Sequence, residues 1–346
     1  MRIDSLNKFE KKVLRGSASN YIDFLTDEQL DKAYFTKEIK KKDNSSIRSI
    51  QCINNEHPVY KIQKQLKSNF FDFIPLSNHA YGYVRGKSYY DHLKPHVKSR
   101  YYLKLDIKDF FPSIRDSSLR EVLEYFIDDE VRINNELPLL DFIIKTVTFK
   151  GSLPQGAVTS PVLSNIYFTY LDIRISRYCQ KFGVQYSRYV DDLLFSSDNL
   201  FLHKKVFANG INKILRSRGF QLNSSKIKKT IDEISLNGFV VGENIRLSRR
   251  KLALVSGLIY CYQHSPKKTL ENLILEIREH FNFDKNQNIN LRRLHNYLAG
   301  YRSFLLGLLP FDSVGVMSED MTKANKKILF KVNEIEKILD LTATDI

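Results

Sequence analysis

Two adjacent aspartates between two short strand-like runs constrain this chain more than any other feature. Residues 185–190 and 193–196 are rich in apolar and β-favouring residues, and only Asp191 and Asp192 lie between them. This spacing predicts a β-hairpin with both carboxylates at its turn. A solvated turn is the plainer alternative, but the apolar residues on both sides favour a core hairpin in which the charges have a function.

A third aspartate, Asp106, ends a strand predicted over residues 101–107. Antiparallel strands lie about 4.8 Å apart, so Asp106 can meet the hairpin carboxylates. Mg²⁺ prefers oxygen ligands, and two such ions about 4 Å apart activate a 3′-hydroxyl and stabilise the leaving pyrophosphate. The pattern predicts nucleotidyl transfer with Asp106, Asp191 and Asp192 as catalytic residues. Since successive strand side chains alternate, we expect the stronger ligand to be Asp191.

Composition favours a polyanionic partner. The chain has 346 residues, 42% of them hydrophobic, with 54 Lys and Arg against 39 Asp and Glu and a net charge of +15. The apolar fraction excludes wholesale disorder, and the charge favours nucleic acid over a membrane surface, because no basic amphipathic anchor is evident. The absence of a signal peptide and of membrane spans predicts a cytoplasmic protein. The three cysteines form no CxxC pair, which agrees with a reducing compartment.

Three motifs in order resemble those of reverse transcriptases. Residues 189–192, Tyr-Val-Asp-Asp, resemble the YxDD signature of that family. Residues 105–114 resemble the strand that carries its first catalytic aspartate, and residues 153–161 resemble its nucleotide-pocket loop. The resemblance continues more weakly over residues 47–304. The resemblance implies that this chain is an enzyme that copies RNA into DNA.

The implied fold class is α+β, a right-hand polymerase with fingers, palm and helical thumb. The palm would contain an antiparallel sheet that carries the YxDD hairpin. We expect an N-terminal helical extension over residues 1–46, fingers and palm over 47–243, and a helical thumb that binds RNA or primer–template over 244–346.

The resemblance implies a site with two Mg²⁺ ions. Asp106, Asp191 and Asp192 would hold them together with the backbone carbonyl of Ile107, and dNTPs would be the substrates. The family pattern assigns a nucleotide-binding role to six residues: Arg48, Arg85, Phe111, Gln155, Gly156 and Lys226. Phe111 would lie beneath the sugar and favour DNA synthesis, unless it is a core residue. The two arginines would grip the triphosphate, and Lys226 would act as a general acid on pyrophosphate.

The resemblance also implies a primer grip and an RNA-binding thumb. The primer grip would comprise Leu236, Asn237, Gly238 and Phe239. The RNA-binding residues would be Arg246, Arg249, Arg250, Lys251, Arg292, Arg293, Tyr297 and Tyr301. Helical spacing places Arg293, Tyr297 and Tyr301 on one face, where basic and aromatic side chains suit backbone tracking and base stacking. Solvated charges over an aromatic core stripe are the alternative.

The branch of the family stays open. The length resembles bacterial retron-type enzymes, which usually carry Asn-Ala-x-x-His before the first catalytic strand and Val-Thr-Gly at the primer grip. Residues 92–96 match only the final histidine, and residues 236–238 match only the glycine. These departures favour neighbouring defence-associated reverse transcriptases that copy a dedicated noncoding RNA.

Three functions compete. The first is an RNA-directed DNA polymerase that copies a cognate structured noncoding RNA in antiphage defence, with a DNA product and an effector protein from the same system. The second is a scaffold that uses the fold to bind RNA or a toxin partner. The third is a two-metal nuclease, which the lack of extra His and Glu disfavours. Homo-oligomers, the priming group and the identity of the RNA stay open.

Overall fold

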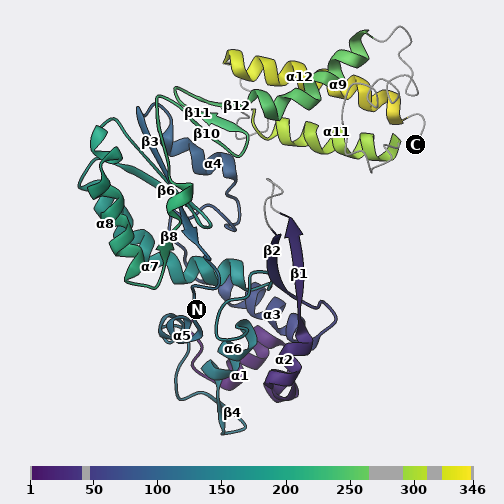
Figure 1. Cartoon of the computed structure of the whole chain (residues 1–346). Coiled ribbons are helices and arrows are strands. Elements are labelled where there is room, and N and C mark those ends of the chain that lie inside the picture. The colour runs from purple at the N-terminus through teal and green to yellow at the C-terminus, as the bar shows by residue number, and fades with distance from the viewer. Residues whose placement is uncertain (1, 41–46, 265–290, 310–321, 344–346) are drawn as a thin grey trace. The chain divides into compact units, whose positions relative to one another are not determined.

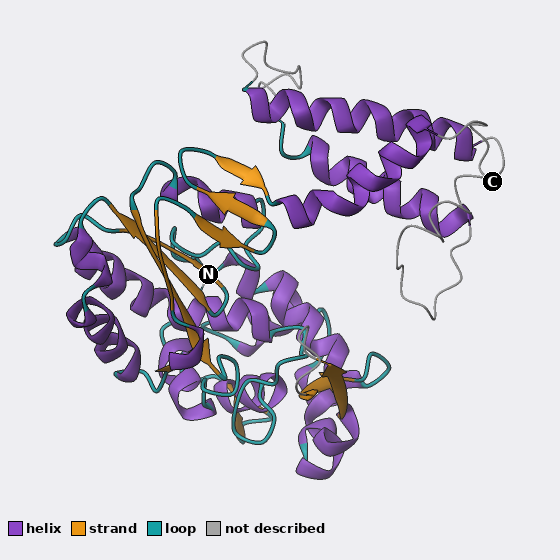
Figure 2. Ribbon diagram, turned by 45° about the horizontal axis from the view of Figure 1, so that its top comes forward, coloured by secondary structure: helices purple, strands orange, loops and turns teal. Residues whose placement is uncertain are grey.

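The computed structural model describes residues 2–40, 47–264, 291–309 and 322–343 (Figures 1 and 2). It is a mixed structure of helices and antiparallel sheets. Within these described ranges, none of the helices combines the length and the apolar character needed to cross a bilayer.

The chain separates into two compact units, Met1–Glu233 and Ile234–Ile346. The first domain boundary expected from the sequence, at 46/47, lies beside residues that the structure does not describe. The second expected boundary, at 243/244, falls inside the second compact unit, after the first two strands of a small sheet.

The N-terminal part of the first unit combines helices with one long hairpin. Its elements are α1 (Leu6–Phe9), a π-helical turn (Glu10–Leu14), a 3-10 helix (Ala18–Leu25), α2 (Asp27–Ala33), β1 (Tyr34–Lys40), β2 (Ile47–Ile53), α3 (Pro58–Asn69) and a 3-10 turn (Phe71–Phe73). Pro58 begins α3, and the helical spacing buries Val59, Ile62 and Leu66 completely. The structure differs from the expected helical extension at β1, because all seven of its residues pair with β2.

The remainder of the first unit contains one central sheet. Its helices and short turns are α4 (Tyr89–Leu93), a 3-10 turn (Lys94–His96), α5 (Asp116–Leu123), α6 (Leu139–Val147), α7 (Ser160–Gln180), a 3-10 turn (Leu200–His203), α8 (Lys205–Arg216) and a 3-10 turn (Ser224–Lys226). Its strands are β3 (Tyr101–Lys108), β4 (Arg132–Ile133), β5 (Leu137–Pro138), β6 (Gln185–Tyr189), β7 (Asp192–Ser197), β8 (Gln221–Leu222) and β9 (Lys228–Ile231). The order β6-β7-β3-β8, with β9 also paired to β3, makes β3 the central strand.

The two faces of this sheet have different chemistry. Directly opposite residues of antiparallel strands share a face, and the β3–β7 register pairs Asp106 with Asp192 and Leu103 with Phe195. The face of Phe195 is the core face, where its ring lies 5.5 Å from that of Phe207 on α8. Alternation therefore places Asp106 and Asp192 on the other face, away from α8.

A chain of buried hydrogen bonds lies farther along the carboxylate face. The imidazole of His96 lies between two serine hydroxyls, with Nε2 2.7 Å from Ser187 Oγ and Nδ1 2.8 Å from Ser196 Oγ. His92 Nδ1 lies 2.8 Å from the same Ser187 Oγ. Burial lowers the pKa of His92 to about 3 and holds the pKa of His96 well below its ordinary value. Both rings are therefore neutral, and a buried polar network accounts for the histidine that matches the family pattern.

Acid is expected to destabilise the protein through these two rings. Histidine in the unfolded chain takes up a proton below pH ~6.5, which the buried rings do not. The free energy of unfolding should fall by up to about 1.4 kcal/mol per pH unit for each histidine between pH ~6 and ~4. Urea unfolding at several pH values measures this slope. His96→Asn should reduce it, whereas His264→Gln, at an exposed position, should not; equal slopes in both variants would contradict the assignment.

In the part of the second unit that the structure describes, a small sheet is joined to three helices. The elements of this part are β10 (Ile234–Leu236), β11 (Phe239–Val241), β12 (Ile245–Leu247), α9 (Arg249–His264), α11 (Leu291–Leu306) and α12 (Lys323–Ala343). The strands form an antiparallel meander in the order β10-β11-β12. Helix α12 packs against both α9 and α11, with buried apolar residues such as Leu258, Leu298 and Ile335.

Candidate active site

The three aspartates gather where β3 meets the β6–β7 turn. Asp106 and Asp192 are directly opposite each other in the β3–β7 pair. Asp191 precedes Asp192, and its carbonyl oxygen accepts a hydrogen bond of 3.0 Å from the backbone N–H of Ile107. Asp106 is 5% exposed, so its carboxylate is held at the edge of the core. The predicted side-by-side arrangement of the two strands is thus present.

The turn itself differs from the prediction by one residue. Tyr189 pairs with Asp192, so the two turn residues are Val190 and Asp191, and Asp192 is the first residue of β7. Sequence pattern alone favours the polar pair at the turn, because valine is disfavoured there. The observed register instead gives Asp192 a fixed cross-strand partner in Asp106 and leaves Asp191 at the turn.

Two lysines neutralise part of this negative charge. Lys226 Nζ lies 3.1 Å from Asp106 Oδ2, which agrees with its expected place near the site. Lys104 Nζ lies 2.7 Å from Asp192 Oδ1, a contact not predicted from the sequence. The signal is its position two residues before Asp106, because side chains two apart on a strand share a face.

The electrostatics of the site favour a bound cation. Burial, followed by the neighbouring charge of Asp192, raises the pKa of Asp191. Burial also raises the pKa of Asp192, whereas Lys104 opposes that rise. Carboxylates crowded in this way repel one another in a medium of low dielectric.

The donor set suits Mg²⁺. Among the described residues, no three acidic, histidine or cysteine side chains converge into a ready-made metal cage. Mg²⁺ does not require one, because it is commonly held by one or two carboxylates together with waters and substrate phosphates. Asp106, Asp191 and Asp192 supply only hard oxygen ligands, as that ion prefers. The role expected for the Ile107 carbonyl stays a prediction.

Removing one of these charges is expected to stabilise the metal-free protein. Asp191→Asn should raise the midpoint of thermal unfolding by about 2–4 °C at pH 7.5 in EDTA, because it removes a charge that is disfavoured by burial and by repulsion from Asp192, the two causes that raise the pKa of Asp191. MgCl₂ should then raise the wild-type midpoint and have less effect on the variant. Differential scanning fluorimetry of both, with Asp129→Asn at an exposed position as control, measures these shifts; a lower midpoint for Asp191→Asn in EDTA would contradict the argument.

The nucleotide-pocket loop is fixed against β2. The backbone N–H of Gly156 donates to the carbonyl of Gln51 at 2.8 Å, and Gly156 forms a parallel β-bridge with Cys52 on β2. A Cβ on Gly156 would lie 2.7 Å from Cys52 Sγ and from Gln51 O, so only glycine permits this approach. The half-buried Gln155 lies beside it. The β1–β2 hairpin and the nucleotide-pocket loop are therefore joined directly through their backbones.

The other expected nucleotide contacts have varied surroundings. The side chain of Arg48 is outside the described atoms, while its backbone pairs with Ile39. Arg85 is exposed and lines an open pocket of about 730 Å³ together with Tyr83. Phe111 is 5% exposed and its ring lies 5.4 Å from that of Phe110. Phe111 is thus observed in the core. Its expected contact with the nucleotide sugar stays a prediction.

The expected primer-grip residues form the β10–β11 turn of the second unit. Leu236 and Phe239 are paired strand residues, and Asn237 and Gly238 both have positive φ, at 45° and 86°. Ser248 N–H donates to the Gly238 carbonyl at 2.8 Å. The turn is therefore tied to the start of α9 within the same unit.

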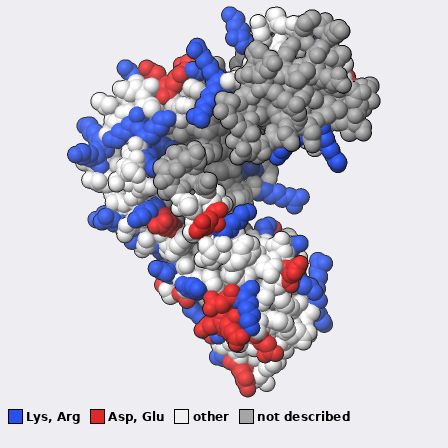
Figure 3. Space-filling view, turned by 45° about the vertical axis from the view of Figure 1, so that its right-hand side comes forward, with Lys and Arg blue, Asp and Glu red and all other residues white. Residues whose placement is uncertain are grey.

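The expected RNA-binding residues lie on β12, α9 and α11. Arg246, Arg249, Arg250, Lys251, Arg292 and Arg293 are exposed. The rings of Tyr297 and Tyr301 lie 5.9 Å apart on α11, as helical spacing predicts, and Tyr301 Oη donates to the Lys251 carbonyl at 2.7 Å. Lysine and arginine side chains are spread over the face shown in Figure 3 with acidic ones among them. Nucleic-acid binding by these residues stays a prediction.

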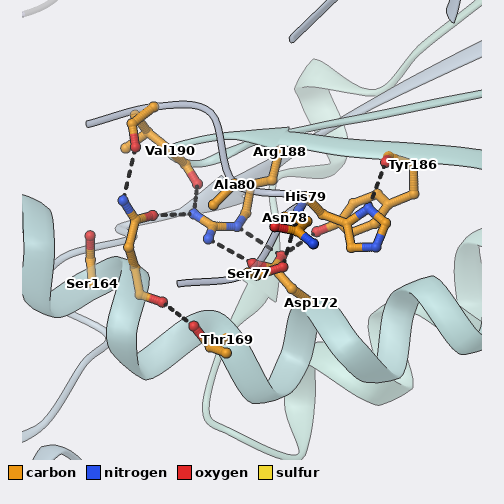
Figure 4. A network of polar contacts seen from close by, with 12 residues as sticks. Ser77, Asn78, His79, Ala80, Ser164, Thr169, Asp172, Tyr186, Arg188 and Val190 are labelled. Atoms are coloured by element: carbon orange, nitrogen blue, oxygen red, sulfur yellow. Dashed lines mark hydrogen bonds and ion pairs between the residues drawn. The ribbon is translucent and has the colours of Figure 1, made fainter. Parts of the chain in front are cut away.

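A buried polar network beneath the Val190–Asp191 turn is not predicted by the sequence pattern. It joins Asn165 and Asp172 on α7 to Tyr186 and Arg188 on β6 (Figure 4). Arg188 and Asp172 form an ion pair of 2.8 Å with both side chains fully buried. The sequence feature that could have indicated this network is the presence of polar residues within apolar runs. Polar residues in such positions are usually buried only when they are paired.

Comparisons with known proteins agree with this geometry. The family model "Reverse transcriptase (RNA-dependent DNA polymerase)" matches residues 39–256. The chain is 28% identical over 296 residues to the retron Ec73 reverse transcriptase of Escherichia coli, covering 82% of this chain and 84% of that protein.

Two further relatives are matched over shorter segments. The retron Mx65 reverse transcriptase of Myxococcus xanthus is 27% identical, with 58% of this chain and 49% of the relative covered. The retron Ec86 reverse transcriptase of Escherichia coli is also 27% identical, with 58% and 64% covered. The match thus spans about half to two thirds of the length of these two proteins.

Among solved structures, a telomerase from Candida albicans gives a TM-score of 0.48 at 13% identity, with 90% of this chain and 66% of that chain covered. The predicted fold class, an α+β right-hand polymerase, is confirmed by the family match together with the mixed helix and sheet. Because the family model matches more than half of its residues, the chain belongs to the reverse transcriptase (RNA-dependent DNA polymerase) family.

Proposed function

We propose that this chain is an RNA-directed DNA polymerase that copies a cognate structured noncoding RNA into DNA by two-metal nucleotidyl transfer. The observation that carries the proposal is the cross-strand pair of Asp106 and Asp192 with Asp191 at the adjoining turn. Three carboxylates on a buried β-scaffold can hold reacting groups in place without a covalent nucleophile. The family match supports the same chemistry.

The residues of the site have separable roles in this reaction. Mg²⁺, when bound, supplies a Lewis acid that lowers the pKa of a primer 3′-hydroxyl and offsets charge on the triphosphate. Asp106, Asp191 and Asp192 would hold the metal ions, with Asp106 buried and the other two half-buried. We propose that Lys226 donates a proton to the departing pyrophosphate, which its 60% exposed side chain and its 3.1 Å contact with Asp106 support.

The second unit supplies a candidate surface for the template and primer. Its exposed arginines and its paired Tyr297 and Tyr301 combine charge with stackable rings. RNA recognition of this kind depends on shape and single-stranded segments more than on a base code. We propose that a noncoding RNA binds there and that dNTPs and a DNA product complete the set of partners.

The relatives suggest a biological setting. Those described above are named retron reverse transcriptases. We therefore propose a retron-type or related enzyme that works in the cytoplasm in antiphage defence, together with an effector protein from the same system. The oligomeric state stays open.

Sequencing of copurified nucleic acid tests the proposal most directly. The wild-type protein and Asp191→Ala with Asp192→Ala should be purified from cells that carry the native locus, with and without RNase and DNase. We expect one structured RNA in both samples and complementary DNA only in the wild type. Equal DNA in both samples would overturn the catalytic role, and RNA alone, unchanged by the substitutions, would favour a scaffold.

A further inference from the structure

The backbone of the Val190–Asp191 turn adopts an unfavourable conformation. Val190 has a φ of 61°, and it is the only β-branched residue with positive φ among the described residues. The left-handed region is disfavoured for such a side chain, at a cost of about 1–3 kcal/mol. Strain of this size persists only where the surroundings hold the backbone. The contacts that do so identify the parts of the fold that position Asp191.

One arginine bonds directly to the strained residue. Arg188 Nη1 donates to the carbonyl oxygen of Val190 at 3.2 Å and to Asn165 Oδ1 at 3.0 Å (Figure 4). Alternation along β6 places Arg188 on the core face, opposite to the face that carries Asp106 and Asp192. The guanidinium therefore supports the turn from behind, and with 0% exposure it does not reach substrate.

The second support reaches the turn from another segment. Asn165 Nδ2 donates to the carbonyl of Gly82 at 2.8 Å. Gly82 lies directly against the turn, because a Cβ built on it would be 2.6 Å from Val190 Cγ2. The preceding residues pair with β6, since Tyr81 N–H donates to Arg188 O at 2.9 Å. Asn165 thus links the guanidinium to the segment that packs on Val190.

The orientation of Arg188 is itself fixed. Its Nε and Nη2 donate to the two carboxylate oxygens of Asp172 at 3.0 and 2.8 Å, a bidentate pair. Tyr186 Oη donates to Asp172 at 2.7 Å, and the guanidinium lies 4.4 Å from the ring centroid of Phe168. A buried ion pair is weak evidence for stability, because apolar residues often replace one without loss. In this network the ion pair fixes the orientation of the Arg188 guanidinium toward Val190.

We infer that Arg188 and Asn165 are positioning residues that hold the Val190–Asp191 backbone and so place the Asp191 carboxylate for metal binding and catalysis. The inference rests on the proposed function of that carboxylate. A displacement of about 1 Å at a reacting group lowers a rate by about 100-fold. A network that tethers this backbone through one direct hydrogen bond, from Arg188 to the Val190 carbonyl, and that holds Gly82 in close packing against Val190 can have an effect of that order.

Asn165→Ala tests the inference with Ser164→Ala as matched control. Ser164 is also buried on α7, and its hydroxyl bonds to the Pro161 carbonyl without any link to the turn. Both variants should lose some thermal stability. Asn165→Ala alone should lower kcat for dNTP incorporation by about 10- to 100-fold, with KM for dNTP changed less than about threefold.

Mg²⁺ dependence supplies a readout apart from activity. The MgCl₂ concentration that half-saturates the rise in melting temperature should increase several-fold in Asn165→Ala and stay unchanged in Ser164→Ala. Gly82→Ala, which pushes a methyl group against Val190, should give the same shift. If both variants match Ser164→Ala in kcat and in Mg²⁺ dependence, the network is only a structural brace and the inference is overturned. A wild-type protein that binds Mg²⁺ without RNA-templated synthesis would overturn the proposed function instead.

Discussion

Asp106→Asn is expected to lower RNA-templated dNTP incorporation by about 1000-fold or more. Asparagine keeps the shape of the side chain and one oxygen, but it lacks the charge that binds a hard cation. Asp106 is on the central strand, directly opposite Asp192, so the substitution removes the charge of one of these two paired carboxylates. Single-nucleotide extension of a primer on an RNA template, at saturating MgCl₂ and dNTP, measures the effect.

The matched control is Asp109→Asn. Asp109 is three residues farther along the chain, is exposed, and has a φ of 45°, which asparagine adopts readily. This variant should incorporate dNTP within about twofold of the wild type, as is usual for surface changes. Melting temperatures show whether Asp106→Asn stays folded. A folded Asp106→Asn with wild-type rates would remove Asp106 from the catalytic set.

Local pattern was sufficient for the elements that carry the site. Alternation and apolar runs predict strands close to the observed β3, β6 and β7. Pairing of the first and second aspartate-bearing strands follows from antiparallel geometry and is observed as the β3–β7 register. The YxDD motif then indicates which residues of these strands are expected to be catalytic, Asp191 and Asp192.

Tertiary contacts determine the features that the local sequence pattern does not predict. The register that places Asp192 in β7 depends on Val190 accepting a positive φ, which local propensity opposes. β1 reads as part of a polar, helix-prone segment, but its pairing with β2 outweighs that preference. Lys104 and Arg188 are ordinary basic residues in the sequence, and only the packed sheet shows which carboxylate each one meets.

Arg188→Met is expected to lower the free energy of unfolding by about 3–5 kcal/mol. The change leaves Asp172, which is fully buried, without its cation. Arg218→Met is the control, because its ion pair with Glu121 is partly exposed, at 29% and 64% of the two side chains, and pairs that reach solvent contribute about 0–1 kcal/mol. Urea unfolding at pH 7.5 measures both. A loss as small in Arg188→Met as in Arg218→Met would contradict the burial of an uncompensated charge.

Combining Arg188→Met with Asp172→Asn separates stability from positioning. The double variant has no unpaired buried charge, and asparagine keeps an acceptor for the Tyr186 hydroxyl. Most of the lost stability should therefore return. The carbonyl of Val190 still lacks its donor, so kcat and Mg²⁺ affinity should stay low although the protein is folded. Activity that returned in proportion to stability would make Arg188 a brace for the core alone, whereas a folded and slow enzyme would show that the buried pair is retained for the geometry of Asp191.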